Sequence, residues 1–310
     1  MKNFELKTSD VYFRGEFVPF SDANLNITSS PVLYGLSIYT VFAASWNTEN
    51  QKLYIFRLKD HYKRLVNSAR IMNFHNFQDR CSFTEFQSTM KELLTRNQVE
   101  EDVLVRVTIF IDELVAGTKL HGLKNSWSAY ITPMGEILPL SGINVCVSSW
   151  ARTPDNSIPA RAKVNGNYVN ASLMKNEALR GGFDDAIALD HNGHVSEGTV
   201  TNVFLVRDGV LITPDSSSDI LEGITRDSII KIADNMGLSC QERTVDRTEL
   251  YVADEVFFCG SSARITPVLS VDKRKIGNGE PGKITKDFMQ YLETVQRGQK
   301  DDFQSWLTIV

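Results

Sequence analysis

The segment from Ala160 to Tyr168 reads ARAKVNGNY, and the segment from Val195 to Asn202 reads VSEGTVTN. Each holds one residue suited to chemistry, Lys163 in the first and Glu197 in the second. A lysine amine is a nucleophile that condenses with carbonyl groups, and a buried carboxylate stabilises positive charge on a partner. Most lysines and glutamates are solvated surface charges, so the surrounding residues decide whether these two are functional.

A long spaced pattern surrounds the glutamate. It reads Glu197-x-Thr199-x-x-Asn202-Val203-Phe204, then Leu211-x-Thr213, then Leu221-x-Gly223-Ile224-x-Arg226. Together with the lysine segment, it closely resembles the class IV, or fold-type IV, pyridoxal phosphate aminotransferases, above all the branched-chain amino acid aminotransferases. The resemblance extends more loosely from about residue 10 to about residue 295, through YG at 34–35, DHYKRL at 60–65 and ADEVF at 253–257.

The resemblance implies an α/β (α+β) fold of two domains with the cofactor at their interface. It also implies a homodimer, or a higher homo-oligomer, whose partner chain closes each site. Residues 132–142 read TPMGEILPLSG, without clear periodicity, which predicts the interdomain connection. We therefore expect a small N-terminal domain over residues 1–131, a loop over 132–142, and a large cofactor-binding domain over 143–310.

Composition narrows the class of protein. The chain has 310 residues, 42% of them hydrophobic, with a net charge of -5, which is typical of a soluble globular protein. The basic residues are scattered, which argues against a nucleic-acid partner. No stretch predicts a membrane span, and the first seven residues, MKNFELK, lack the apolar core of a signal peptide. The widely spaced cysteines and histidines predict neither disulfides nor a metal site, so we expect a cytoplasmic protein.

Periodicity predicts an α+β N-terminal half. Strands are expected on both sides of Gly15, at residues 52–56 and at residues 103–111. Apolar residues recurring at three and four positions predict helices from about 58 to 73 and near 84–96.

The C-terminal half alternates more strongly. A strand at 144–149 leads to the Lys163 loop, and a helix ends at Gly181-Gly182. Residues 186–213 resemble a β-meander of consecutive hairpins, with turns at Asn192-Gly193 and Asp208-Gly209. A helix is expected over residues 226–236, directly after Thr225.

Three residues are implied to act on the cofactor ring. Lys163 would form the Schiff base and carry the proton during transamination, which requires a neutral amine. Glu197 would keep the pyridine nitrogen protonated, and Tyr168 would hydrogen-bond the phenolic oxygen. The alternatives are a surface lysine on a loop, an exposed turn glutamate and a core tyrosine.

A second group is implied to hold the phosphate. Arg64 would bind it with a fixed charge, and Thr225 would bind it at a helix N-terminus together with Gly223 and Ile224. Ser261, in the small-residue turn GSSA at 260–263, would add backbone donors, and Leu221 would pack on the ring.

The substrate side departs from the branched-chain pattern. Where those enzymes usually carry a glutamate-glycine-isoleucine-arginine run after an aromatic residue, this chain has Tyr39-Thr40-Val41-Phe42-Ala43. Leu104 replaces the usual tyrosine two residues before Arg106. The expected substrate residues are Tyr34 and Tyr39 as walls, Arg106 for a second carboxylate, and Ser261 and Ser262 for the α-carboxylate.

The predicted function is transamination of L-amino acids, branched-chain ones above all, with 2-oxoglutarate and glutamate as the second pair. Within the same fold, a D-amino-acid aminotransferase, an amine aminotransferase or a 4-amino-4-deoxychorismate lyase is the alternative. A non-catalytic dimeric scaffold is the alternative from another class, and it conflicts with the presence of Lys163, Glu197, Arg64 and Thr225 together.

Overall fold

The computed structural model describes residues 10–74, 77–115 and 117–310, which form two compact units. The first contains residues 10–135, Ala162–Gly166 and Thr294–Val310, and the second contains Glu136–Arg161 and Asn167–Glu293. The domain bounds expected from the sequence remain a prediction, and the units differ from them because two later segments join the first unit. The opening residues 1–9, where no signal peptide is expected, and His75 lie outside the described residues.

An antiparallel sheet forms the first unit, with strands in the order β16-β4-β3-β5-β6-β1-β2. The strands are β1 (Asp10–Phe13), β2 (Glu16–Pro19), β3 (Ser37–Asn47), β4 (Lys52–Phe56), β5 (Val103–Ile111), β6 (Asn125–Pro133) and β16 (Leu307–Ile309). The helices are α1 (Ser30–Tyr34), α2 (Leu58–Ile71), α3 (Phe77–Arg80) and α4 (Phe83–Arg96), with short 3-10 helices at Phe20–Asp22 and Asp301–Trp306.

Strand β3 explains why distant segments join this unit. Strand β4 pairs only with residues 44–47 of β3, so the edge of the earlier half of β3 is open to another partner. Val164 fills this edge by bridging to Ile38. At the other end of the chain, β16 adds to the outer edge of β4. Backbone pairing therefore holds Ala162–Gly166 and the C-terminal segment in the first unit.

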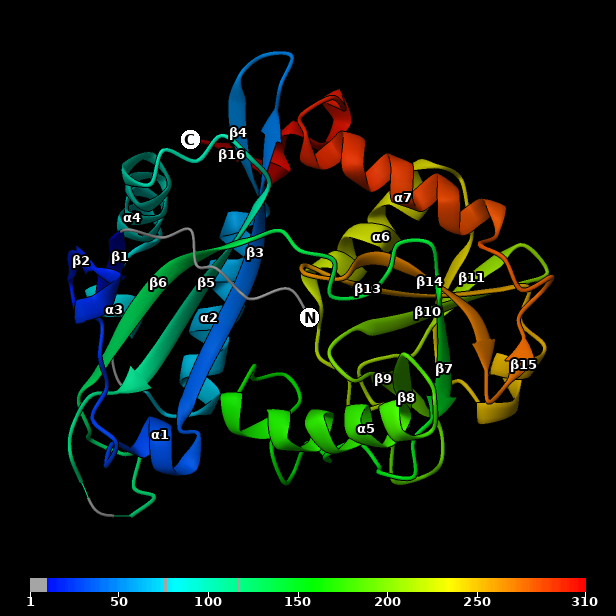
Figure 1. Ribbon diagram of the computed structural model, residues 1–310, viewed down its shortest axis with the longest axis horizontal. Helices are drawn as coiled ribbons and strands as arrows, with labels where there is room; N and C mark the ends of the chain where they lie inside the picture. Colours follow the sequence, from blue (N-terminus) through cyan, green and yellow to red (C-terminus); the bar gives the residue numbers. More distant parts are fainter. Residues whose placement is uncertain (1–9, 75–76, 116) are drawn as a thin grey trace. The chain divides into compact units, whose positions relative to one another are not determined.

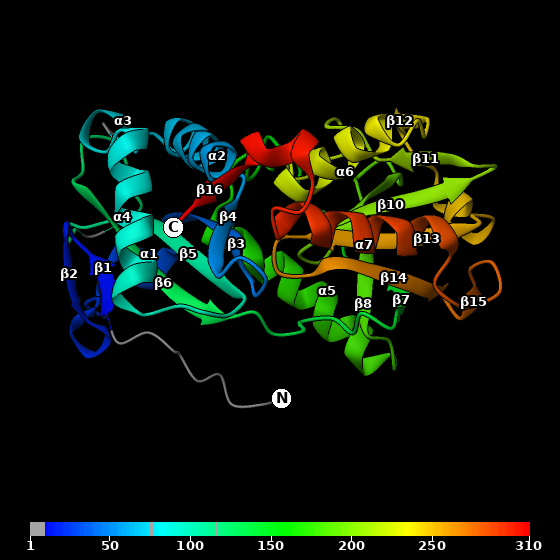
Figure 2. The same cartoon turned by 90° about the horizontal axis from the view of Figure 1, so that it is seen from above.

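Helices α2 and α4 pack on the sheet and on each other (Figures 1 and 2). The expected helices at 58–73 and 84–96 are confirmed within a few residues. The apolar positions of α2 are buried, as their spacing predicts, but His61 is buried among them with 1% of its surface exposed. A buried histidine on a core-facing stripe needs a hydrogen-bonding partner, which is described below.

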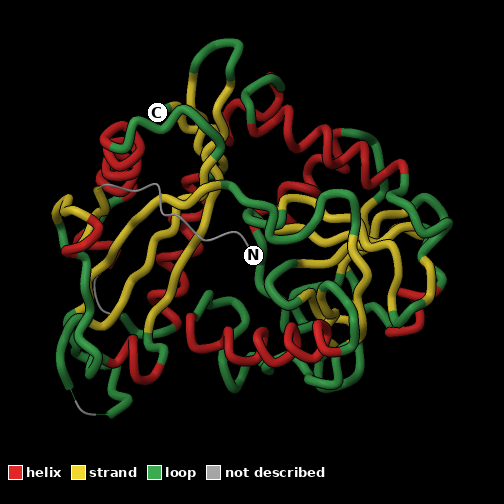
Figure 3. Tube along the Cα trace, viewed as in Figure 1, coloured by secondary structure: helices red, strands yellow, loops and turns green. Residues whose placement is uncertain are grey.

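The second unit contains a larger sheet in the order β12-β11-β10-β13-β14-β7-β8-β9, with β15 paired to β14 (Figure 3). The strands are β7 (Ile143–Val147), β8 (Asp185–Leu189), β9 (Val195–Gly198), β10 (Asn202–Arg207), β11 (Val210–Thr213), β12 (Cys240–Glu242), β13 (Glu255–Gly260), β14 (Arg264–Val271) and β15 (Arg274–Lys275). The helices are α5 (Tyr168–Arg180), α6 (Ile224–Asn235) and α7 (Lys283–Gln296), with 3-10 turns at Asn165–Asn167 and Arg247–Tyr251. The last turn of α7 and residues 165–166 belong to the first unit.

The expected β-meander is wrong in one respect. The hairpins β8–β9 and β10–β11 both form, with turns at the predicted positions. However, β9 and β10 are not neighbours in the sheet, because β13, β14 and β7 lie between β10 and β8. Strands β10 and β13 pair although they are far apart in the sequence, and local periodicity does not reveal such a pairing.

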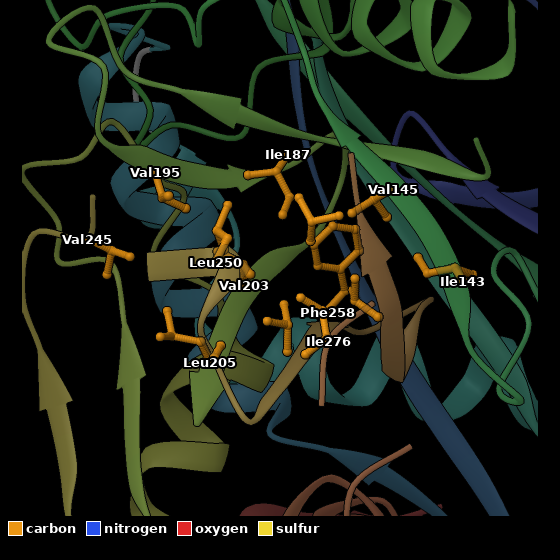
Figure 4. Packing of buried hydrophobic residues seen from close by; sticks show 14 of the residues in the cluster. Ile143, Val145, Ile187, Val195, Val203, Leu205, Val245, Leu250, Phe258 and Ile276 are labelled. Carbon is orange, nitrogen blue, oxygen red and sulfur yellow. The ribbon is translucent and has the colours of Figure 1, made fainter. Parts of the chain in front are cut away.

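The core of the second unit follows from alternation along β13. Phe257 stacks on Phe204 of β10 at 5.2 Å between ring centroids and also contacts Phe288 of α7. The next residue, Phe258, points to the other face and joins an aliphatic cluster with Ile187 and Leu250 (Figure 4). Both faces of this strand are therefore buried, and the sheet provides a rigid base for the loops at its ends.

The part of the chain that the structure describes contains no helix of the length and apolar character required to span a membrane. All four cysteines fall in this part, and their sulfurs are unpaired thiols.

Candidate active site

The peptide of Lys163 is fixed on both sides. Its N–H donates to the Ser68 hydroxyl of α2 at 3.2 Å, and its carbonyl accepts from the Tyr39 N–H of β3 at 3.0 Å. The Ser68 hydroxyl in turn donates to the Arg64 carbonyl at 2.9 Å. Ser68 has no exposed surface, so helix α2 and strand β3 hold the lysine backbone through buried contacts. The side chain of Lys163 therefore starts from a defined position.

The Lys163 amine lies over the ring of Tyr39, at 5.0 Å from its centroid. Arg106 contacts the same ring, with its guanidinium carbon 3.7 Å from the centroid. Tyr39 is 5% exposed, and the antiparallel register places it on the same face of the sheet as Arg106 and Leu104. Arg106 also donates to the Asn165 side chain at 2.6 Å. The structure thus brings together Lys163, Tyr39 and Arg106, three of the residues predicted from the sequence.

The opposite face of β3 carries Thr40, which points toward α2. Its hydroxyl lies 2.8 Å from Nδ1 of His61, and Arg64 donates to it from Nη2 at 3.3 Å. Burial lowers the pKa of His61 well below its ordinary value, and the positive charges of Arg64, Arg57 and Lys163 lower it further. The His61 ring is therefore neutral at physiological pH.

A close approach of two backbone segments keeps the lysine loop next to α1. Gly35 has φ of +67°, and a β-carbon on it would lie 2.7 Å from the α-carbon of Gly166. Both the left-handed conformation and the contact require glycine. Tyr34, which precedes this glycine, is 44% exposed on α1 and is outside the buried group around Lys163, so its substrate role stays a prediction.

Glu197 is the centre of a buried polar group in the second unit. Arg152 donates to its Oε1 at 2.6 Å, and Asn202 and the Leu221 N–H donate to its Oε2 at 3.0 and 3.1 Å. The side chains of Glu197 and Arg152 are only 6% and 9% exposed. These donors stabilise the carboxylate in its ionised form, which excludes the alternative of an exposed turn glutamate.

Gly223 gives Asn202 the space to hold this carboxylate. A β-carbon on Gly223 would lie 2.0 Å from Oδ1 of Asn202, whose Nδ2 also donates to the Leu221 carbonyl at 2.9 Å. Gly223 is the N-cap of α6, so the expected helix start at residue 226 is corrected to Ile224. Thr225 is consequently a buried residue of the first turn and not the cap. The N–H groups of this turn have no acceptor within the helix and are suited to binding an anion.

The remaining predicted residues also belong to the second unit. Ser261 and Ser262 lie in the turn between β13 and β14, and both are half-buried. Cys259, just before this turn, pairs with Asn202, so the turn and the Glu197 group are at the same end of neighbouring strands. Tyr168 begins α5 and packs against its buried alanines, which also fits the alternative of a core tyrosine.

Sequence patterns missed several residues of this site. Arg152 contacts Glu197 and Ser68 contacts Lys163, each from a position far away in the sequence, and His61 contacts Thr40, which itself accepts from Arg64. The only sequence signal for them is the polar character of His61 and Ser68 on an otherwise apolar helical stripe. Among the described residues, no cluster of histidine, cysteine, aspartate or glutamate is suited to holding a metal ion.

Comparisons with known proteins show which family the chain is similar to. The sequence profile of the amino-transferase class IV family matches residues 40–271. A probable branched-chain-amino-acid aminotransferase of Aquifex aeolicus is 39% identical over 313 aligned residues, which cover 100% of this chain and 99% of the relative.

Solved structures show the same similarity. The branched-chain aminotransferase of Thermoproteus uzoniensis, solved with norvaline, has a TM-score of 0.91 and 33% identity, covering 97% of this chain and 99% of that chain. The branched-chain amino acid aminotransferase of Thermobaculum terrenum, solved in its PLP-bound holo form, has a TM-score of 0.92 and 32% identity, covering 98% of this chain and 99% of that chain.

Proposed function

The chain belongs to the class IV aminotransferase family, and from this premise we propose that it transfers the amino group of branched-chain L-amino acids to 2-oxoglutarate. It is a fold-type IV aminotransferase that depends on pyridoxal 5'-phosphate. When bound, this cofactor supplies an aldehyde that reacts with amines and a ring that withdraws electrons from the reacting carbon.

The residues present fit this cofactor. Lys163 supplies an amine, and Glu197 is a buried, ionised carboxylate suited to a protonated ring nitrogen. In the second unit the N-terminus of α6 around Gly223 and Thr225 suits a phosphate, and in the first unit the guanidinium of Arg64 does so. A residue suited to each charged or reactive part of the cofactor is therefore available.

The roles proposed for these residues follow from their surroundings. The Lys163 amine takes a proton from the α-carbon of the amino acid, and its fixed peptide limits the positions from which it can do so. Glu197 would hold a proton on the ring nitrogen, because a buried carboxylate held by several donors favours a positive charge beside it. The Tyr168 hydroxyl donates to the phenolic oxygen, Leu221 and Ile224 contact the ring and phosphate, and Ser261 adds a backbone donor to the phosphate.

One observation carries the substrate assignment. Arg106 and Lys163 both lie against the ring of Tyr39, so a fixed cation and the reactive amine share one aromatic wall. Leu104 is apolar and occupies the same sheet face as Arg106. An aliphatic side chain would pack on Tyr39 and Leu104, and the second carboxylate of glutamate would pair with Arg106. Ser261 and Ser262 would hold the α-carboxylate, and Tyr34 would add a further wall.

Steady-state kinetics test this function. We expect kcat/KM for L-leucine, L-isoleucine, L-valine and L-glutamate to exceed that for D-alanine and for a simple chiral amine. Arg106→Leu should reduce kcat/KM for L-glutamate at least about tenfold more than for L-leucine, because only glutamate loses a charge-assisted bond worth about 1.5–3 kcal/mol. Lys163→Ala is the control for turnover: it should fold and bind the cofactor but lose nearly all activity. Borohydride reduction should leave no cofactor attached to this variant, because the lysine that would link it is absent. A preference for D-alanine or the amine would overturn the branched-chain assignment.

We also propose that the enzyme is a homodimer or a higher homo-oligomer. Phe20, Leu25, Ile27, Val32 and Leu33 are between 37% and 79% exposed within one short stretch of the first unit. A run of exposed apolar side chains of this kind favours burial against another surface. Sedimentation of the purified protein tests this state.

A cytoplasmic location completes the proposal. Its support is the set of four unpaired cysteine thiols, which are typical of a reducing compartment. Fractionation of the source cells tests this location. Detection of the protein outside the cytoplasmic fraction would contradict it.

A further inference from the structure

A buried chain of hydrogen bonds links Arg64 to two residues that have no assigned role. Thr40 has no exposed surface and His61 is 1% exposed, and the hydroxyl of the first lies between the ring of the second and Arg64. Thr40 is also one of the positions at which the chain departs from the run typical of branched-chain enzymes.

The direction of each hydrogen bond follows from the donors available. A guanidinium has only donors, so the Thr40 oxygen must accept from Arg64. The single hydroxyl hydrogen is then free to point at Nδ1 of His61, 2.8 Å away. For that bond to form, Nδ1 must lack a hydrogen, which places the ring hydrogen on Nε2. A charged imidazole, with hydrogens on both nitrogens, would instead donate from Nδ1, and the Thr40 oxygen would then accept from both His61 and Arg64.

The surroundings of His61 keep it in this form. Besides Arg64, the cations Arg57 and Lys163 act on the ring, and Phe42 of β3 packs against it with 5.5 Å between ring centroids. The only acid of α2, Asp60, is paired with Arg57 at 2.7 Å. Positive charge and an apolar contact therefore both disfavour the charged form of the ring, and the neutral ring can accept the Thr40 hydroxyl hydrogen on Nδ1.

We propose that Thr40 and His61 are positioning residues that orient the Arg64 guanidinium for the phosphate of the cofactor. This inference rests on the proposed function, in which Arg64 binds that phosphate. An arginine side chain has several rotatable bonds, and fixing one Nη from behind leaves the other donors aligned for an anion. The threonine hydroxyl conveys this constraint because its acceptor and donor directions are both occupied.

Equilibrium binding to the full-length apo protein tests the proposal, with three probes: pyridoxal 5'-phosphate, inorganic phosphate, and pyridoxal, which lacks the phosphate. Thr40→Val should raise Kd for the two phosphate-bearing probes about tenfold, equivalent to about 1.4 kcal/mol, and leave Kd for pyridoxal unchanged. Thr40→Ser, which restores the hydroxyl, should bind within about threefold of the parent. His61→Phe should raise Kd for the same probes as Thr40→Val does. The double variant should bind these probes no more weakly than the weaker-binding single variant.

Two controls separate the possible failures. Thr132→Val changes a buried threonine two strands away in the same sheet and should leave all three Kd values unchanged. Arg64→Gln should weaken binding of both phosphate-bearing probes. If it does not, Arg64 does not hold the phosphate and that part of the proposed function fails.

If Arg64→Gln weakens binding but Thr40→Val and His61→Phe do not, the positioning role alone is overturned. An equal loss of affinity for pyridoxal in Thr40→Val would also overturn the positioning role, because the effect would then be structural and not specific to the phosphate. Thermal unfolding of each apo variant establishes that it folds. If Thr40→Val does not fold, binding to His61→Phe decides whether the positioning role holds.

Discussion

At the scale of single residues, the ion pair between Arg152 and Glu197 has the largest expected energetic effect. Both side chains are almost fully buried, and the pair distance is 2.6 Å. A buried pair of this kind contributes little net stability compared with apolar residues, but removing one partner leaves a charge without compensation. The carboxylate proposed for the ring nitrogen therefore depends on an arginine that the sequence pattern did not identify.

We predict that Arg152→Met lowers the free energy of unfolding of the apo protein by about 3–5 kcal/mol. The double variant Arg152→Met/Glu197→Gln should recover part of this loss, because no isolated charge remains. Urea unfolding at pH 7 measures both. The matched control is Arg161→Met, whose ion pairs with Asp155 and Glu222 are exposed and should be worth less than about 1 kcal/mol. Equal losses in the two single variants would contradict the prediction.

The sequence identified residues whose chemistry is visible without the fold. Lys163 and Glu197 stand out because they lie in long spaced patterns; the structure fixes the Lys163 backbone on the buried Ser68 hydroxyl and places Glu197 in a buried polar group. Arg152 and Thr40 could not be identified in this way, because their partners lie far along the chain and a lone arginine or threonine has no specific pattern. The start of α6 was predicted two residues too late, with Thr225 just before the helix, because Gly223, and not a hydroxyl residue, caps it.

At the scale of elements, α2 presents three site residues along one face. His61, Arg64 and Ser68 are spaced by three and four residues, so they lie on the same side of the helix. Their partners are the Thr40 hydroxyl and the Lys163 peptide. A single helix therefore positions both the proposed phosphate ligand and the backbone of the proposed catalytic lysine.

We predict that Ser68→Ala reduces the rate of the first half-reaction about tenfold, because the Lys163 N–H loses its acceptor and the lysine becomes less well positioned. Stopped-flow kinetics with L-leucine measure this rate. Thr89→Ala is the matched control: its hydroxyl also donates to the carbonyl four residues earlier, at 2.9 Å, but on the exposed side of α4. A similar rate loss in both variants, or none in Ser68→Ala, would exclude the positioning role.

Elements with a clear period were predicted well, and those without one were not. The helix α2 and the strand β5 match the expected ranges closely, since their apolar residues recur at helical or alternating spacing, and β4 matches as a short apolar run. Strand β3 was missed because almost all of its residues are buried, so it has no alternation of polar and apolar positions. The pairing of β10 with β13 was missed because it is set by contacts distant in sequence.

At the scale of the whole molecule, several apolar side chains of the first unit are left exposed by the described residues of a single chain. Val32 and Leu33 are each 54% exposed and Ile27 is 79% exposed. Exposed apolar residues are common singly, but here they are concentrated next to the 3-10 turn at Phe20–Asp22 and in α1. Gly35, which ends α1, contacts the Lys163 loop, so this surface is linked to the lysine through one short segment.

We predict that the parent protein sediments as a dimer or larger species of its 34.9 kDa chain, and that Val32→Asp/Leu33→Asp shifts it toward the monomer. Burying two carboxylates without partners costs several kcal/mol per interface, which is enough to change the association constant by orders of magnitude. Sedimentation velocity from about 0.1 to 10 micromolar, which spans a Kd of about 1 micromolar or about -8 kcal/mol, measures the shift. Ile71→Asp, which changes an exposed apolar residue at the end of α2, is the control and should leave the oligomeric state unchanged.

Because α1 adjoins the lysine loop through Gly35 and Gly166, the dissociated variant should also lose affinity for the cofactor. A parent that sediments as a monomer would refute the oligomer, and an unshifted double variant would show that another surface forms it.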